Sequence, residues 1–195
     1  MSDTASPRIL GCSRSSAADR PTMEITRVQP FLEYLDRVHE RTRKVIQCVR
    51  DDDLEWHATP DRFSPGDLIR HLAAIERFMY AETVHGRPTR YPGHGRELAE
   101  GLGPTIAYYD RLHQESCGLF AELTDARLAE KCLTPAGTPI TVGKWLRAMI
   151  EHEAHHRGQL YFILGMRGTP TPPIYGLTSE QVRARSAPSA TLAGA

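Results

Sequence analysis

The chain has 195 residues, with 24 basic and 24 acidic side chains and a formal net charge of zero. Hydrophobic residues make up 40% of it, enough for the core of one domain. No apolar run approaches the roughly 20 residues needed to span a bilayer, and no basic block stands out. This composition argues against nucleic-acid binding and against membrane insertion, and we expect a cytoplasmic protein.

The two ends of the chain differ from its middle. Residues 1–22 are rich in Ser, Ala, Arg and Asp and lack the apolar region of a secretory signal, so we expect a disordered leader. Met23 is a candidate translation start. Residues 186–195 are small and polar, which predicts a disordered tail. The folded domain is therefore predicted over residues 23–185.

The four cysteines, Cys12, Cys48, Cys117 and Cys132, are widely spaced and form no C-x-x-C pair. This spacing argues against a cysteine zinc site and favours a reducing compartment. Cys48 and Cys117 fall in predicted helices, where a small buried thiol is more common than a catalytic one.

The first two helices follow from apolar periodicity. Residues 30–49 place Phe31, Tyr34 and other apolar residues on one side. The acidic run at residues 51–53 is interpreted as a solvated helix end in preference to a metal site. Ser64 and Pro65 then form a typical helix start, and the second helix runs to about residue 84. His71 lies on its predicted inward stripe.

A long connection follows at residues 85–103, rich in Gly, Pro and Arg and without apolar periodicity. A connection of this length is uncommon in a compact bundle unless it crosses over or lines a site. We predict a crossover that covers the mouth of a site, and Tyr91 and His94 are candidate substrate contacts.

The second half of the chain contains two more long helices. The third covers residues 104–123, and its His113 faces either the interior or the flank. Residues 134–139 are a turn-rich connector to the fourth helix, at residues 142–167. A capping-box pattern that begins at Thr178 predicts a short last helix ending near residue 185.

The fourth helix carries the main candidate site. His152 and His156 are four residues apart, so they lie on one face of the helix. Burying two imidazoles without partners would cost a few kcal/mol, which a metal ion or a hydrogen-bonded core would offset. With His71, three histidines occupy predicted inward positions, and this favours a metal site. The predicted inward stripe of the fourth helix comprises Trp145, Met149, His152, His156, Gln159 and Ile163.

The same residues also satisfy the H-E-x-x-H pattern of zinc metallopeptidases, with Glu153 as general base and Glu180 as a downstream third ligand. The longer metzincin motif is absent, because Gln and Phe stand at positions 159 and 162. No strand that would fix a peptide substrate precedes the pattern. Glu153 faces a site only if the helix is rotated from the predicted orientation.

From Pro30 to about Arg185, the chain resembles the DinB-like, or DinB/YfiT-like, family of metalloenzymes. The resemblance rests on the segments Asp67-Leu68-Ile69-Arg70-His71-Leu72 and His152-x-x-x-His156-Arg157-Gly158-Gln159-Leu160. It implies an all-α fold: a four-helix bundle with a long crossover between helices two and three, plus a short C-terminal helix. It also implies that His71, His152 and His156 bind a divalent metal, zinc or nickel.

Three neutral imidazoles leave coordination positions open, as in a catalytic site. The resemblance implies a thiol-dependent S-transferase acting on electrophilic small molecules, because characterised relatives use thiols such as bacillithiol or mycothiol. Hydrolysis by metal-activated water stays open. So does a non-enzymatic, metal-binding stress-response bundle, which a fourth ligand such as His113 or His94 would favour. A homodimer is plausible from the family.

Three further residues near the central motif have expected roles. Arg157 and His155 lie about 100° to either side of the ligand directions, so we expect them behind the ligands or at the surface. Gln159 is expected to orient a neighbouring helix or a ligand.

Overall fold

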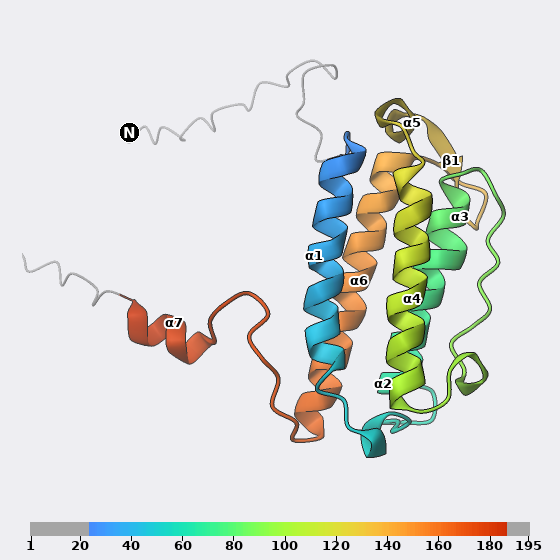
Figure 1. The fold of residues 1–195 in the computed structure, drawn as a ribbon. Helices are drawn as coiled ribbons and strands as arrows, with labels where there is room; N and C mark the ends of the chain where they lie inside the picture. The colour runs from blue at the N-terminus through green and yellow to red at the C-terminus, as the bar shows by residue number, and fades with distance from the viewer. Residues whose placement is uncertain (1–23, 187–195) are drawn as a thin grey trace, which may run out of the picture.

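A computed structural model describes residues 24–186 and shows a bundle of four long helices (Figure 1). The predicted leader and Met23 lie outside the described residues, as does the predicted tail apart from Ser186. Within residues 24–186, no helix is long and apolar enough to cross a membrane.

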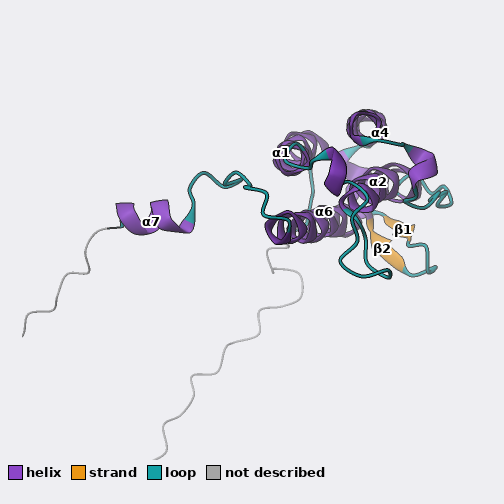
Figure 2. Ribbon diagram, turned by 90° about the horizontal axis from the view of Figure 1, so that it is seen from below, coloured by secondary structure: helices purple, strands orange, loops and turns teal. Residues whose placement is uncertain are grey.

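The four bundle helices form two parallel pairs. In Figure 1, α1 and α6 run downward and α2 and α4 run upward. Seen from below, α1, α4, α2 and α6 follow one another around the bundle axis (Figure 2), and each contacts the next. Because the neighbours α2 and α4 are parallel, the chain must travel the length of the bundle between them. The helices are α1 (Val28–Ile46), α2 (Pro65–Ile75), α4 (Leu102–Ala121) and α6 (Val142–Met166).

This topology confirms the predicted four-helix bundle with its long crossover. The crossover includes a short 3-10 turn at Arg96–Leu98 and otherwise has no regular structure. The short C-terminal helix is also present, as α7 (Ser179–Arg185), and it projects away from the bundle (Figure 1). Its capping box at Thr178 is formed as predicted.

The second helix begins as its sequence predicts, with a capping box between Ser64 and Asp67 and with Pro65 in its first turn. After Ile75 the helix continues as a π-helical segment, Glu76–Tyr80, and then as α3, Ala81–Thr83. π-helical turns are rare and occur often at functional sites. This one lies five residues beyond His71, and it turns Glu76 into the core.

The connector before α6 holds three elements that the sequence did not reveal. They are α5 (Asp125–Ala129) and the antiparallel strands β1 (Lys131–Leu133) and β2 (Pro139–Thr141). The turn between the strands matches the predicted turn-rich segment, and Gly137 adopts a φ of 76° there. Strands of three residues are too short to show alternation in a sequence.

The bundle core consists of two apolar halves with a polar layer between them. Leu35, Leu72, Leu112 and Leu146, one from each long helix, are almost fully buried, and each burial is worth about 1.5–3 kcal/mol. The polar layer separates these halves at the same level of each helix. Its buried residues are His39 and Thr42 on α1, Glu76 on the π-helical segment, His113 and Ser116 on α4, and Glu153 and Arg157 on α6.

The predicted inward stripes of α2 and α6 are only partly correct. Met149 and His156 are buried as predicted, whereas His71 is half-buried and Gln159 is exposed. On α6 the buried positions include Leu146, Glu153 and Leu160, whereas Trp145 and Ile163 are only partly buried. His71 and His152 therefore lie at the edge of the core. His71 then contacts both His152 across the helix interface and Tyr91 in the crossover.

Two smaller predictions about the first helix and its end also need correction. Tyr34 is 43% exposed and does not belong to the buried side of α1. Asp53 is fully buried, because its carboxylate accepts hydrogen bonds from Arg50 at 2.7 Å and from Arg167 at 2.6 Å. Only Asp51 and Asp52 form the predicted solvated end.

Candidate metal centre

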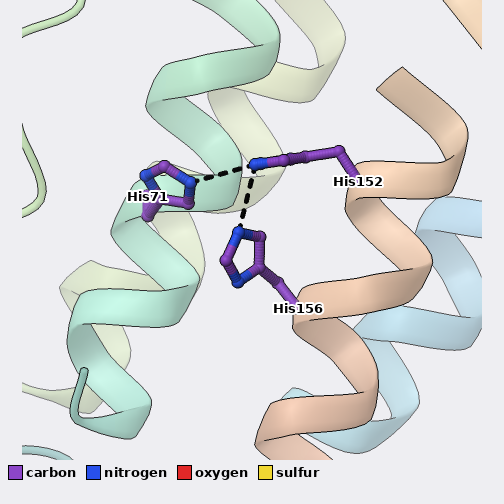
Figure 3. A group of neighbouring side chains, drawn as sticks. All are labelled: His71, His152 and His156. Carbon is purple, nitrogen blue, oxygen red and sulfur yellow. Dashed lines mark hydrogen bonds between the residues drawn. The ribbon is translucent and has the colours of Figure 1, made fainter. Parts of the chain in front are cut away.

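Three imidazoles from two helices converge between α2 and α6 (Figure 3). Nε2 of His152 lies 3.2 Å from Nε2 of His71 and 3.1 Å from Nε2 of His156. His152 and His156 are brought together by their spacing on α6, whereas His71 comes from the neighbouring helix. One nitrogen of each ring lies within 4.8 Å of the other two.

The geometry of this cluster fits a metal ion. A tetrahedral ion with metal–nitrogen bonds of about 2.0–2.1 Å separates its ligand nitrogens by about 3.3 Å. The observed separations of 3.1 and 3.2 Å are close to this value. Zinc is commonly bound in this way by histidine nitrogens.

The protonation of the rings agrees with a ligand role. Nδ1 of His156 lies 2.7 Å from Oε1 of Gln159, which can only accept a hydrogen bond. The proton of a neutral His156 is therefore on Nδ1, and Nε2 keeps a free lone pair that points at the other rings. Gln159 thus orients His156, one of the two roles expected for it.

Tyr91 orients the second ring. Its hydroxyl lies 2.7 Å from Nδ1 of His71 and 3.2 Å from Nδ1 of His94. When Nδ1 of His71 carries the proton, it donates to Tyr91, whose own hydroxyl donates to His94. Burial raises the pKa of Tyr91 to about 12, so its hydroxyl stays protonated near neutral pH. Such partners of metal-binding histidines fix both tautomer and ring orientation.

Burial and mutual repulsion keep the three rings neutral. Burial, followed by the neighbouring imidazoles, lowers the pKa of His71 to about 3 and that of His152 to about 4. Burial also lowers the pKa of His156. Neutral imidazoles are the form that binds a metal ion, and the cluster is in that form at neutral pH.

Arg70 fastens the crossover that carries Tyr91 and His94. Its fully buried guanidinium donates to the carbonyls of Ala99 at 3.0 Å and of His94 at 3.2 Å, and it forms an ion pair with Glu55. Arg70 stands in the segment quoted for the family resemblance, but no role was predicted for it from the sequence. A signal was available, because Arg70 is the only charged residue between Leu68 and Ile75.

A pocket of about 780 Å³ reaches the cluster at His156. Phe63 forms part of its wall and also packs against the rings of His71 and His94, with centroid separations of 5.4 and 4.4 Å. Most of the lining surface is apolar, but the charged side chains of Asp61 and Arg62 also line the pocket. No role was predicted for Phe63, which lies in a connection without periodicity. The other lining residues include Ala58, Thr59, Leu68, Phe162, Ile163 and Met166.

Several residues named from the sequence lie away from the cluster. His113 pairs with Glu76 in the polar layer, 3.1 Å from its carboxylate, so it faces the interior. Arg157 is buried and donates to Thr42 at 3.1 Å and to Tyr175 at 3.0 Å. It supports α6 from behind the histidines, one of the two positions expected for it.

Neither carboxylate of the metallopeptidase interpretation lies at the cluster. Glu153 points into the bundle, where it accepts a 2.7 Å hydrogen bond from Tyr109. Burial, and then the charge of Glu76, raise the pKa of Glu153. Glu180 lies on α7, which projects away from the bundle (Figure 1). His155 is exposed and lines the pocket beside His156.

Comparison with solved structures shows the same fold in three bacterial proteins. A DinB-like protein from Bacillus cereus ATCC 10987 has a TM-score of 0.63 at 20% identity, covering 74% of this chain and 95% of its own. YjoA, a DinB-like protein from Bacillus subtilis, has a TM-score of 0.62 at 16% identity, covering 75% and 98%.

The third structure, YfiT from Bacillus subtilis, is described as a probable metal-dependent hydrolase with an unusual four-helix bundle topology. Its TM-score is 0.61 at 16% identity, and the match covers 77% of this chain and 94% of YfiT. The TM-scores of these three matches show a shared fold.

Sequence comparison gives the family directly. The chain is 26% identical over 160 residues to the uncharacterized protein YrdA of Bacillus subtilis (strain 168), a match that covers 77% of this chain and 89% of YrdA. The model of the DinB superfamily matches residues 34–160, which contain all three clustered histidines. The chain belongs to the DinB superfamily.

Proposed function

We propose that His71, His152 and His156 bind a divalent metal ion and that the protein is a metal-dependent enzyme acting on a small molecule. The convergence of the three Nε2 atoms carries this proposal: that of His152 lies 3.2 Å from that of His71 and 3.1 Å from that of His156. Zinc and nickel are the metals we propose first, because both accept imidazole ligands.

The ligand set supports catalysis more than a structural metal. Among residues 24–186, no fourth His, Cys, Asp or Glu joins the group of three. The two residues that would have closed the site have other partners, since His94 contacts Tyr91 and His113 contacts Glu76. A site with three protein ligands keeps a position for substrate, which is the arrangement of catalytic zinc centres.

When bound, the metal would supply Lewis acidity and lower the pKa of a water molecule or thiol at that position. The protein's own residues would hold and shield it. Tyr91 and Gln159 fix the rings of His71 and His156, and Phe63 limits access of water from one side. The pocket beside His156 would take the apolar part of a substrate.

For the reaction itself we propose transfer of a low-molecular-weight thiol to an electrophilic small molecule. The proposal draws on the resemblance to DinB-like thiol transferases and on the apolar lining of the pocket, which suits an apolar electrophile. A cytoplasmic setting would supply the reduced thiol. It agrees with the free thiols of Cys48, Cys117 and Cys132.

Hydrolysis is the second candidate, and the description of YfiT as a probable metal-dependent hydrolase favours it. The same ligands would serve a water nucleophile. Hydrolysis and thiol transfer differ in whether turnover depends on an added thiol.

The first experiment measures metal content in protein purified without a histidine tag. We expect near-stoichiometric divalent metal in the native chain and its loss in His71→Ala and His152→Ala. His155→Ala is the matched control, since it removes an exposed imidazole of the same helix and should leave the metal in place. Absence of metal from the native chain, also after reconstitution with zinc and nickel, would overturn the proposal.

The second experiment separates the candidate reactions in the metal-loaded protein. An electrophile such as monobromobimane is offered with bacillithiol, mycothiol or cysteine, and a panel of esters and amides is offered without thiol. Thiol-dependent turnover that disappears in His71→Ala supports the transferase, and thiol-independent turnover supports the hydrolase. Metal binding with no turnover in either assay would favour a non-enzymatic metal-binding protein.

A further inference from the structure

A second cluster of reactive groups lies in the polar layer, apart from the three histidines. Sγ of Cys117 is 3.4 Å from Nε2 of His113, and Nδ1 of the same ring is 3.1 Å from Oε1 of Glu76. The thiol and the imidazole are four residues apart on α4, and the carboxylate comes from the π-helical segment. A thiol, an imidazole and a carboxylate are therefore connected in series.

We propose that Cys117 is a reactive cysteine that forms a mixed disulfide with a low-molecular-weight disulfide, with the protonated ring of His113 stabilising its thiolate and with Glu76 as the residue that positions His113. This inference does not depend on the metal site. The thiolate is the nucleophilic form of cysteine, and a neighbouring protonated imidazole favours that form.

Burial makes the arrangement of His113 and Glu76 rigid. The side chains of His113 and Glu76 are 7% and 9% exposed, so few water molecules compete for their contact. Cys117 is half-buried and packs at the margin of the apolar half that contains Leu35 and Leu146. The imidazole is thus inside the bundle and the thiol is at its edge.

The surroundings of His113 favour its charged form. Burial alone lowers the pKa of His113, but the hydrogen bonds to Cys117 and Glu76 and the charge of Glu76 outweigh burial and raise the pKa to about 10. On α1, Asp36 lies 4.0 Å from its Nε2. On α6, the buried carboxylate of Glu153 accepts a hydrogen bond from Tyr109.

His39 completes these surroundings from α1. Its ring stacks on that of His113 with centroids 3.6 Å apart. Burial, and then the charges of His113 and Arg43, lower the pKa of His39 to about 3, so His39 stays neutral against a charged neighbour. Asp110 lies on its far side, 3.4 Å from Nε2. Of the two stacked rings, His113 therefore carries the extra proton, and its carboxylate partner, Glu76, is the closer one at 3.1 Å.

The proposed exchange balances without a further reactant. The thiolate of Cys117, which faces the protonated ring of His113, attacks one sulfur of the disulfide. A bond forms between Sγ and that sulfur while the bond between the two sulfurs of the reagent breaks. The second sulfur leaves as a thiolate and takes a proton from water, and His113 keeps its own proton. The protein thiol is oxidised, and one half of the reagent is reduced.

The test uses the full chain and cystamine as the disulfide, with each cysteine followed by mass spectrometry of its peptide. Cys48 is the internal control, because it is also partly exposed but bonds only to the carbonyl of Lys44, and burial raises its pKa. The accessibility of a cysteine changes its rate of disulfide exchange by the same factor at every pH. The ionisation of its thiol instead changes how steeply that rate depends on pH. We therefore compare the two cysteines between about pH 5 and pH 9.

We expect Cys117 to react at least about tenfold faster than Cys48 near pH 6, with a rate that changes little with pH. In His113→Gln the rate at Cys117 should fall about tenfold and become steeply pH-dependent. In Glu76→Gln, the rise in the rate at Cys117 should move to higher pH, although the thiol itself is unchanged. Equal pH profiles for Cys117 and Cys48 in the native chain would overturn the proposal, and that comparison requires no variant to fold.

Discussion

Tyr91, in the crossover, fixes the ring of His71 on α2 through a contact of 2.7 Å between Oη and Nδ1. The contact joins residues 20 positions apart and sets which nitrogen of His71 faces the other two histidines. Arg70 holds the segment that carries Tyr91, so the ring, its partner and the anchor form one unit.

The first prediction concerns this contact. Tyr91→Phe keeps the aromatic ring but removes the hydroxyl that orients His71, and we expect metal affinity to fall by about 10–100-fold. Competition with a chelator of known affinity measures the change. Tyr161→Phe is the matched control, because its hydroxyl bonds only to the carbonyl of Pro172 at the surface. Equal affinities for the native chain and Tyr91→Phe would contradict this role of Tyr91.

The second prediction compares two glycines of α6. A Cβ at Gly143 would overlap the carbonyl of Ile25, whereas a Cβ at Gly165 would meet no atom within 4 Å. We expect Gly143→Ala to lower the free energy of unfolding by about 1–3 kcal/mol, because the backbone must shift. Gly165→Ala should raise it by about 0.4–1 kcal/mol through helix propensity. Urea denaturation measures both, and changes of the same sign would contradict the prediction.

The third prediction concerns the buried carboxylate of Asp53. Asp53→Asn keeps the shape but weakens the bonds from Arg50 and Arg167, and we expect a loss of about 1–3 kcal/mol in the free energy of unfolding. The exposed neighbour provides the control, since Asp52→Asn should change stability by less than about 0.5 kcal/mol.

The stability lost in Asp53→Asn should depend on pH. Burial alone raises the pKa of Asp53, but the bonds and charges of Arg167 and Arg50 outweigh it and lower the pKa below 3.8. A lowered folded-state pKa contributes stability above 3.8 that is lost as pH falls through the folded value. The gap between the native chain and Asp53→Asn should therefore narrow in acid. A gap that widens in acid would show that the carboxylate is not stabilised as an anion.

The fourth prediction concerns the charged form of His113. Its folded-state pKa of about 10 lies above the ordinary value of 6.5, so its contribution to stability is complete below pH 6.5 and is lost as pH rises toward 10. We expect His113→Gln to be less stable than the native chain by about 1–3 kcal/mol near pH 6, with the difference shrinking toward pH 10. His39 titrates below this window, since its pKa is about 3.

Urea denaturation at a series of pH values measures this difference. Glu76→Gln is the companion variant, because it removes the negative charge that favours the charged ring and should weaken the same pH dependence. A constant difference between the native chain and His113→Gln from pH 6 to pH 10 would contradict the predicted protonation.

The sequence was informative wherever the relevant spacing is local. Apolar periodicity predicted the four long helices, and Ser64 and Thr178 predicted two helix starts, because capping depends on residues three apart. The i, i+4 spacing placed His152 and His156 on one face for the same reason. The strands β1 and β2 were not predicted, because each has only three residues.

By itself the sequence determined the helical fold, the long crossover and the three histidines as candidates for one site. Only the tertiary structure decided which face of each helix is buried, since an error of one residue rotates a side chain by about 100°. That rotation placed Glu153 in the core beside Tyr109 and His71 at the edge. The partners of His71 and His113 come from other elements, so packing between helices selected them and no local pattern could.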